Sequence, residues 1–155
     1  MEPNPIIFLD FDGVICTTRA HFAYANPIGF HRHLDPVAVK LIERLMRSSK
    51  AEIVVSSTWR IGAEKSELEL ALLNSGMGGV NFHSCWRTPS SKEGHRGKEI
   101  EQFFQHHNHN GKFLILDDDS DFLDSQKPFH VKTHPHDGFL WEHYEKSCQI
   151  LGVKI

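Results

Sequence analysis

The sequence predicts an α/β fold in which helices cover both faces of a central, mostly parallel sheet of about five strands. Short continuous apolar runs recur along the chain, and such runs are typical of strands that are buried on both faces. Segments with apolar residues at helical spacing separate these runs. The 155 residues, of which 39% are hydrophobic and 24% charged, suffice for one core. We therefore expect a single domain over residues 1–155, built as a three-layer sandwich.

Five segments are expected to form the strands. Residues 6–9, 53–55 and 113–116 give the strongest signals, because β-branched and aromatic residues dominate these runs. Residues 80–82 and 129–133 give weaker signals and would form short strands. Strands that alternate with helices indicate parallel pairing, as in Rossmann-like folds.

Capping residues mark the helix boundaries. Asp35 is a suitable N-cap, Pro36 suits the first helical position, and apolar residues then mark one helical face. Ser66 and Glu69 form a possible capping box for a second helix, which Gly76 would end.

Two further helices and one irregular segment complete the predicted order. A helix with apolar residues between positions 100 and 104 precedes the strand at 113–116, and residues 140–151 form a closing helix. Residues 14–34 mix Thr, Ala, His, Asn, Pro and Gly without sustained periodicity, so we expect a surface flap there. This segment is too short for a large cap domain.

The bulk composition leaves the partner open. A formal net charge of −3 gives no global attraction to nucleic acid. Cys16, Cys85 and Cys148 are too scattered for a disulfide framework, so we expect reduced thiols and a cytoplasmic protein. Glu2 stands where a signal peptide has basic residues, and the apolar run that follows is too short to cross a bilayer. We expect no membrane partner, and the oligomeric state stays open.

Polar, reactive side chains follow the three strongest strands. Asp10 and Asp12 come after the first, Ser56 after the second, and Asp117 and Asp118 after the strand at 113–116. Ligands of open parallel sheets bind at the carboxyl ends of the strands, so these side chains should meet. Clustered carboxylates repel one another unless a cation offsets their charge. Oxygen ligands favour Mg²⁺ over Zn²⁺.

Three segments of the chain resemble, in order, the motifs of a known superfamily. Residues 6–14, 53–56 and 113–118 are similar to the first, second and fourth motifs of the haloacid dehalogenase-like (HAD) phosphatases. The resemblance implies a HAD-like fold without a large cap and Mg²⁺-dependent hydrolysis of a phosphomonoester. It also implies that Asp10 forms an aspartyl-phosphate, that Asp12 acts as general acid and base, and that Ser56 holds the phosphoryl oxygens.

The resemblance implies a set of metal ligands but does not decide which basic side chain belongs to the site. Asp10, Asp118 and the main-chain carbonyl of Asp12 would bind Mg²⁺, with Asp117 or Asp121 in support. The third motif of the superfamily supplies a basic residue at the start of the helix before the fourth strand. Arg96 and Lys98 both suit this place. They are not equivalent, because Lys is a point charge and Arg a planar fork with several donors.

A finer resemblance concerns the substrate. Four parts of the chain are similar to a small capless branch associated with RNA-repair-type proteins: residues 56–60, the helix start at 96–97, the triple Asp at 117–119, and residues 132–133 followed by 138–140. An open site would suit a phosphorylated protein or the phosphorylated end of a polynucleotide, with a 3′-phosphate as the leading candidate. Gly13, Ser57, Arg60 and residues 17–19 would then contact the substrate.

Other interpretations stay open. The substrate could be a nucleotide or a small metabolite, or the chain could be a non-catalytic module that binds phosphate or docks a partner. The presence of Asp12 favours activity, because binding alone needs no acid two residues after the nucleophile. Trp59 could stack a base or serve as a core or lid aromatic. The 12 histidines could hold zinc, although their spacing favours a solvated surface.

Overall fold

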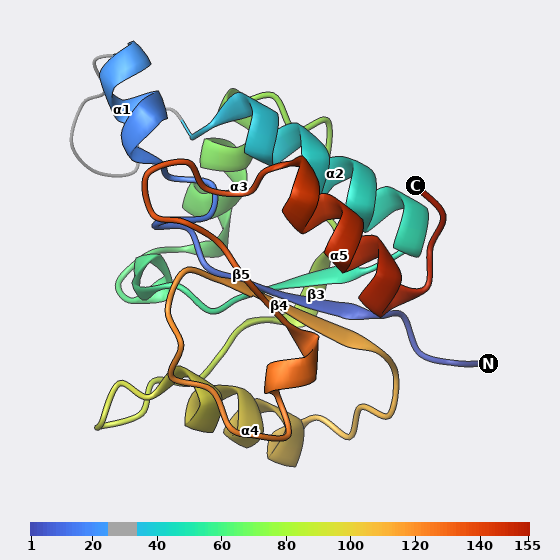
Figure 1. Cartoon of the computed structure of the whole chain (residues 1–155). Helices are drawn as coiled ribbons and strands as arrows, with labels where there is room; N and C mark the ends of the chain where they lie inside the picture. The colour runs from blue at the N-terminus through green and yellow to red at the C-terminus, as the bar shows by residue number, and fades with distance from the viewer. Residues whose placement is uncertain (25–33) are drawn as a thin grey trace.

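A five-stranded parallel sheet forms the centre of the molecule (Figure 1). The computed structural model describes residues 1–24 and 34–155. The strand order is β3-β2-β1-β4-β5, and every pairing is parallel. The strands are β1 (Ile6–Leu9), β2 (Glu52–Val55), β3 (Phe82–Arg87), β4 (Phe113–Asp117) and β5 (His130–Lys132). The predicted α/β class and parallel sheet are confirmed.

The order of the strands creates a switch point beside β1. The chain runs from β1 outward through β2 to β3, then returns to the other side of β1 to form β4 and β5. The backbone pairing continues one residue past the strands, because Asp10 donates its N–H to Leu116 and Ser56 donates to Leu9. The predicted site residues therefore begin where strand order reverses, which is where open α/β sheets bind ligands.

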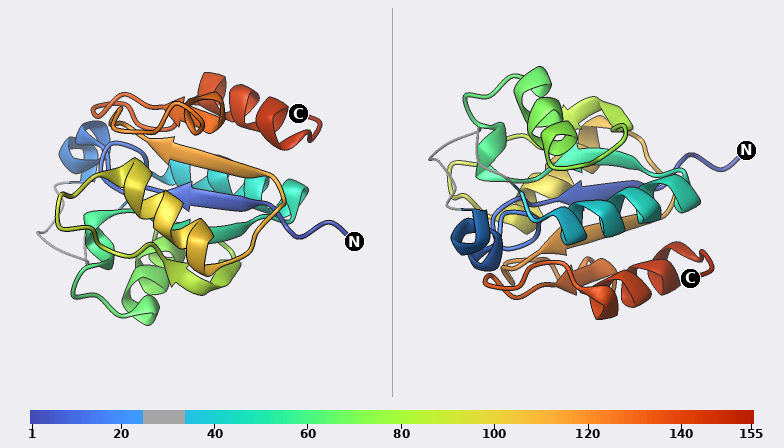
Figure 2. Two further views of the ribbon diagram at one scale, coloured as in Figure 1. Left: turned by 90° about the horizontal axis from the view of Figure 1, so that it is seen from below. Right: turned by 90° about the horizontal axis from the view of Figure 1, so that it is seen from above.

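Helices cover the two faces of the sheet (Figure 2). Side chains alternate along β1: Ile7 and Leu9 face one core cluster, whereas Ile6 and Phe8 face the other. Three helices contribute to the first cluster: α2 (Pro36–Ser49), α3 (Lys65–Asn74) and α5 (Trp141–Leu151). Helix α4 (Arg96–His106) covers the second. The remaining helical pieces are α1 (Thr18–Tyr24) and the 3₁₀ turns η1 (Thr58–Arg60) and η2 (Lys127–Phe129).

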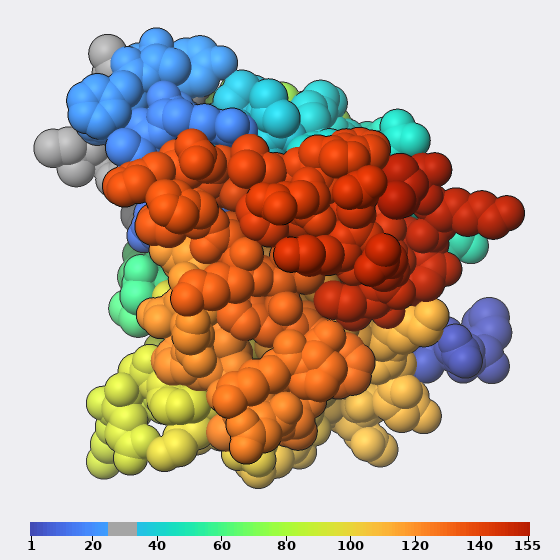
Figure 3. All heavy atoms as spheres, in the orientation of Figure 1, coloured from blue at the N-terminus to red at the C-terminus, as the bar shows by residue number. Residues whose placement is uncertain are grey.

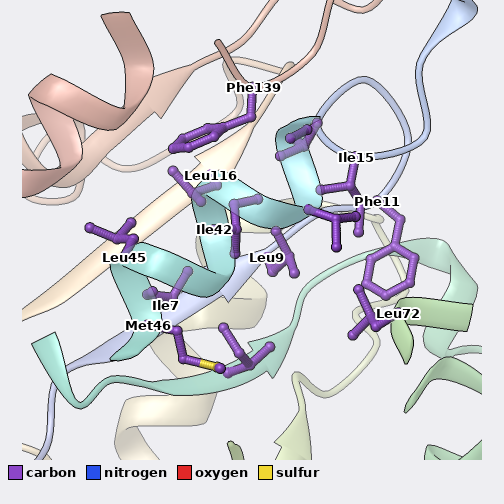
Figure 4. Close-up of a cluster of buried hydrophobic side chains, with 14 of the residues drawn as sticks. Ile7, Leu9, Phe11, Ile15, Ile42, Leu45, Met46, Leu72, Leu116 and Phe139 are labelled. Atoms are coloured by element: carbon purple, nitrogen blue, oxygen red, sulfur yellow. The ribbon is translucent and has the colours of Figure 1, made fainter. Parts of the chain in front are cut away.

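The larger core cluster lies between α2 and the sheet (Figure 4). Ile42 and Leu45 of α2 pack over the apolar residues of β1, and all of these side chains are fully buried. Burying one such side chain contributes about 1.5–3 kcal/mol. Phe11, between Asp10 and Asp12 in the chain, is also fully buried here. The core therefore anchors the loop that carries both carboxylates.

The helix caps agree with the sequence at one helix and differ at another. Asp35 caps α2, since its carboxylate accepts the N–H groups of Val37 and Ala38, and Pro36 is the first helical residue. The capping box predicted at Ser66 is wrong. Helix α3 starts at Lys65, and the Glu67 carboxylate accepts the N–H of Glu64 at 2.7 Å. The earlier Glu-x-x-Glu pair makes the same reciprocal contact that a Ser-x-x-Glu pair makes.

The third strand lies later than predicted. It begins at Phe82, the last residue of the predicted segment 80–82, and extends to Arg87. Strand β3 is an edge strand whose side chains are only partly buried. A half-exposed edge strand needs no continuous apolar run, so residues 83–87 lack the apolar pattern by which the other strands were predicted.

The segment 14–34, predicted to be a surface flap, lies only partly at the surface. Val14 and Ile15 are fully buried in the core, and α1 follows them. Positions 25–33 of the predicted flap lie outside the described residues. In the part of the chain that the structure describes, no helix combines the length and the apolar character needed to cross a membrane.

Candidate active site

Asp10 and the loop after it form the floor of the candidate site. Asp10 follows β1 directly, is 3% exposed, and accepts the N–H of Phe11 at 2.8 Å. Gly13 has a φ of +77°, and a Cβ atom there would lie 2.2 Å from Oδ2 of Asp118. Only glycine suits both the positive φ and the close approach of that carboxylate.

Three carboxylates meet at the carboxyl ends of β1 and β4. Asp10, Asp117 and Asp118 each offer an oxygen, and these oxygens all lie within 4.8 Å of one another. Burial, followed by the charge of Asp117, raises the pKa of Asp10 to about 8. Burial also raises the pKa of Asp117 to about 6 and raises the pKa of Asp118. These carboxylates hold protons more tightly than usual because burial and mutual repulsion outweigh the opposing charge of Arg96.

The donor set of this group fits a hard divalent cation. All of its ligand atoms are carboxylate oxygens, and Oδ2 of Asp117 has no hydrogen-bond partner among the described residues. Within residues 1–24 and 34–155, it is also the one group of His, Cys, Asp and Glu residues that is close enough to hold a metal. Among the described residues, no group of three or more that includes a histidine is close enough to hold a metal.

The structure brings Arg96 rather than Lys98 to the carboxylates. The Nη2 atom of Arg96 lies 3.7 Å from Oδ1 of Asp10, and its Nε atom lies 3.9 Å from Oδ2 of Asp117. The Arg96 side chain is only 15% exposed. Lys98 pairs with Glu93 at 2.6 Å, and its side chain is 49% exposed. Of the two cations suggested by the sequence, Arg96 therefore belongs to the site.

A tight contact with the loop after β4 fixes the position of Arg96. The backbone N–H of Arg96 donates to Oδ2 of Asp121 at 2.9 Å, and that of Gly97 donates to the carbonyl of Asp121. A Cβ atom at Gly97 would lie 2.9 Å from the backbone nitrogen of Leu123. Asp121, predicted as possible metal support, thus anchors the start of α4 through its Oδ2 atom and its carbonyl.

Two polar groups of the site lack partners. Among the described residues, the buried hydroxyl of Ser56 and the buried Nη1 of Arg96 have no hydrogen-bond partner. Leaving such a group unsatisfied costs about 1–3 kcal/mol, so groups of this kind usually face a ligand or water. Ser57, which was predicted to contact substrate, is fully buried and accepts the N–H of Trp59 with its hydroxyl at 3.2 Å.

Arg60 occupies a supporting position in the structure, and its predicted contact with substrate stays a prediction. Its side chain is 3% exposed and pairs with Glu99 at 2.9 Å. The same guanidinium donates to the carbonyls of Ser57, Thr88 and Pro89. These bonds leave Arg60 beneath the loop after β2, where it holds that loop to α4.

A family comparison is consistent with this arrangement. The family described as "HAD domain in Swiss Army Knife RNA repair proteins" matches residues 6–144, which include all the strands and every residue of the candidate site. The chain belongs to this family. No curated protein and no solved structure matches the chain.

An open pocket lies beside the carboxylates of this HAD domain. Its volume is about 330 Å³, and α1 and the loop before α5 form part of its wall. Figure 3 shows α1 next to that loop, and Thr18 Oγ1 lies 2.8 Å from Nδ1 of His136. The lining residues are Asp12, Gly13, Cys16, Thr17, Thr18, His21, Asp118 and Pro135. Sequence reasoning missed three of these residues, Cys16, His21 and Pro135, because neither α1 nor the loop before α5 has a strong periodic signal.

Two side chains of the segment 17–19, which was predicted to contact the substrate, bind another residue of this HAD domain. The hydroxyl of Thr17 donates to Oδ2 of Asp35 at 2.9 Å, and Nη2 of Arg19 donates to Oδ1 of Asp35 at 3.1 Å. Both side chains therefore secure α1 to the start of α2. Thr17 and Thr18 also line the pocket, so this part of the segment borders the open space beside Asp12.

Asp12 has a partner that the sequence did not predict. The indole Nε1 of Trp59 lies 3.2 Å from Oδ1 and 3.1 Å from Oδ2 of Asp12. The indole ring also packs against Phe11, with 5.1 Å between ring centroids. The two partners are 47 positions apart in the sequence, so no local pattern could indicate this contact.

Proposed function

We propose that this HAD domain is a Mg²⁺-dependent phosphomonoester hydrolase that uses Asp10 as its nucleophile. The observation that carries the proposal is the buried group of Asp10, Asp117 and Asp118 beside Arg96. Membership of a HAD family supports a phosphatase-type activity. The raised pKa of Asp10, to about 8, supports a requirement for a cation, since a nucleophile must be ionised.

The first step transfers the phosphoryl group to Asp10. A carboxylate oxygen of Asp10 attacks phosphorus, and the bond between phosphorus and the leaving oxygen breaks. Asp12 gives its proton to that leaving oxygen. The hydroxyl of Ser56 and Nη1 of Arg96 hold the phosphoryl oxygens, which would satisfy both unpaired groups.

The second step returns the enzyme to its starting state. Asp12, now a carboxylate, takes a proton from water as that water attacks phosphorus, and inorganic phosphate leaves Asp10. Asp10, Asp118 and the carbonyl of Asp12 would hold Mg²⁺, with Asp117 close by. When bound, the ion would offset the charge of the carboxylates and of the phosphoryl oxygens.

The proposed substrate is the phosphorylated end of a polynucleotide, and a 3′-phosphate is the preferred candidate. The family is described from RNA repair proteins. The pocket beside Asp12 and Asp118 is open, so a terminal residue could enter while the rest of a strand stays outside. A mononucleotide or a small phosphoester is the alternative substrate within the same chemistry.

Steady-state hydrolysis of p-nitrophenyl phosphate tests the proposed reaction. We expect turnover that requires Mg²⁺ and that Asp10→Asn lowers by roughly 10³-fold or more. Asp124→Asn is the matched control, because its exposed carboxylate pairs only with Lys127 in the described structure. Turnover that survives both EDTA and Asp10→Asn would contradict the proposal, as would phosphate binding without turnover.

A panel of substrates tests the proposed specificity. We expect kcat/KM to be higher for oligonucleotides with a 3′-phosphate than for mononucleotides, sugar phosphates or phosphopeptides. Oligonucleotides with a 5′-phosphate serve as the closest control. Hydrolysis of mononucleotides alone would show that the open pocket does not select a strand end.

A further inference from the structure

The contact between Trp59 and Asp12 links two parts of the site. Asp12 lies in the loop after β1, and Trp59 lies in η1, three positions after Ser56. The indole N–H is directed at both oxygens of the Asp12 carboxylate. We propose that Trp59 is a positioning residue that holds Asp12 in place for its role as general acid and base. This inference rests on the proposed phosphatase function and assigns the side chain that orients its proton-transfer group.

The indole is itself held firmly. The hydroxyl of Ser57 accepts the backbone N–H of Trp59, and the backbone N–H of Arg60 donates to the carbonyl of Ser57. Arg60 then ties this turn to Glu99 of α4 through a buried ion pair. On its other side, the indole packs against Phe11, which is fully buried in the core. The donor atom therefore has a fixed position before substrate arrives, as a preorganised site requires.

Asp12 needs such a partner because it is exposed. Its neighbour in the site, Asp10, is buried, whereas Asp12 lines the open pocket. Within the described residues, the indole of Trp59 is the side chain that hydrogen-bonds the Asp12 carboxylate. An exposed Asp side chain without a partner samples several rotamers, and only some of them reach a leaving oxygen.

The chemistry of indole suits this role. Its N–H is a donor that neither accepts nor exchanges the catalytic proton at working pH, unlike a His or Lys neighbour. It can stabilise the carboxylate of Asp12 that activates water in the second step. When Asp12 is protonated, one oxygen can still accept from the indole while the other donates to the leaving oxygen. Trp59 thus restrains Asp12 through both steps without taking part in proton transfer.

Leaving-group dependence separates this role from a structural one. A poor alkyl leaving group needs the proton from Asp12, whereas p-nitrophenolate leaves readily without it. We expect Trp59→Phe, which keeps the aromatic packing on Phe11, to lower kcat/KM about 10-fold or more for an alkyl phosphate. For p-nitrophenyl phosphate we expect a loss of less than about 2-fold. Trp141→Phe, on α5 with a 51% exposed indole, is the matched control and should change neither value.

A double variant tests the coupling directly. If Trp59 acts through Asp12, Trp59→Phe should cost no further activity towards the alkyl phosphate in an Asp12→Ala background. An equal loss for both esters, or a further loss in the Asp12→Ala background, would overturn the inference while the phosphatase activity stands. Absence of any turnover by the unaltered protein would overturn the proposed function and this inference with it.

The indole N–H resonances test the contact without catalysis. The chain has three tryptophans, so three indole signals are expected in a ¹⁵N–¹H correlation spectrum and can be assigned with Trp→Phe variants. Asp12→Ala should move the Trp59 signal and leave those of Trp86 and Trp141 in place. A Trp59 signal that does not respond to Asp12→Ala would show that the contact is absent in solution.

Discussion

At the scale of single residues, the distance that each side chain spans decides which cation lies at the candidate site. Arg96 and Lys98 are two positions apart on α4, so their side chains leave the helix in different directions. Arg96 extends towards Asp10, whereas Lys98 extends towards Glu93 at the surface. The sequence presents both residues equally, and only the placement of α4 against β1 and β4 selects Arg96.

This difference gives a prediction for the two cations. Arg96→Ala should lower kcat by roughly 10²-fold or more, because it removes a positioned charge from the transferring phosphoryl group. Lys98→Ala should change kcat less than about 2-fold, since it breaks only an exposed pair. Steady-state kinetics with p-nitrophenyl phosphate, and circular dichroism to verify folding, give the comparison. Equal effects of the two substitutions would exclude the assigned role of Arg96.

At the scale of elements, the buried pair of Arg60 and Glu99 joins η1 to α4. The Glu99 carboxylate also accepts the N–H and hydroxyl of Ser91, so it organises the loop before α4 as well. This pair therefore connects the turn that carries Trp59 to the helix that carries Arg96. The two segments that would supply phosphate-binding groups in the proposed reaction are thereby held together.

The pair yields a stability prediction. Glu99→Gln should lower the free energy of unfolding by about 3–5 kcal/mol, because it leaves a buried guanidinium without its counter-ion. Removal of the exposed pair partner in Lys127→Met should cost less than about 1 kcal/mol. Urea unfolding curves for both variants measure the difference. A loss in Glu99→Gln no larger than that of the control would show that the pair does not hold the turn to α4.

At the scale of the whole molecule, the carboxylate group makes stability depend on pH. The pKa of Asp10 is about 8 in the folded chain, against an ordinary value of 3.8. The folded state therefore binds this proton more tightly than the unfolded state does. The contribution of Asp10 to stability is therefore largest below its ordinary pKa and is lost as pH rises towards about 8. Asp117, with a pKa of about 6, acts in the same direction.

This dependence predicts how Mg²⁺ affects the folded protein. Without metal, Asp10→Asn should be more stable than the unaltered chain, and its advantage should grow between pH 5.5 and 8. The comparison between the two proteins removes the contributions of histidines that titrate in the same range. Mg²⁺ should raise the Tm of the unaltered chain more at pH 8 than at pH 5.5, because protons compete with the ion.

Thermal unfolding with and without Mg²⁺ at both pH values checks this prediction. Asp124→Asn, on the surface away from the carboxylate group, should leave the pH dependence of Tm unchanged. A Mg²⁺-induced change in Tm that is the same at both pH values, or that is larger at pH 5.5, would contradict it.

The strong features of the fold follow from local sequence. Apolar runs at residues 6–9, 53–55 and 113–116 became β1, β2 and β4, because strands buried on both faces require continuous apolar side chains. The weaker signals were less accurate: β3 begins where its predicted segment ends, since an edge strand is half exposed. Likewise, Val14 and Ile15 lie in the core although their segment has no sustained periodicity.

By itself, the sequence determined the α/β class, the order of the motifs and the carboxylates that follow β1 and β4. These properties depend on neighbours within a few positions, so a local pattern encodes them. Only the tertiary structure decided that Arg96 reaches Asp10, that Arg60 is buried and that Trp59 bonds Asp12. Each of these contacts joins segments that are far apart in the chain, and the packing of helices on the sheet creates them.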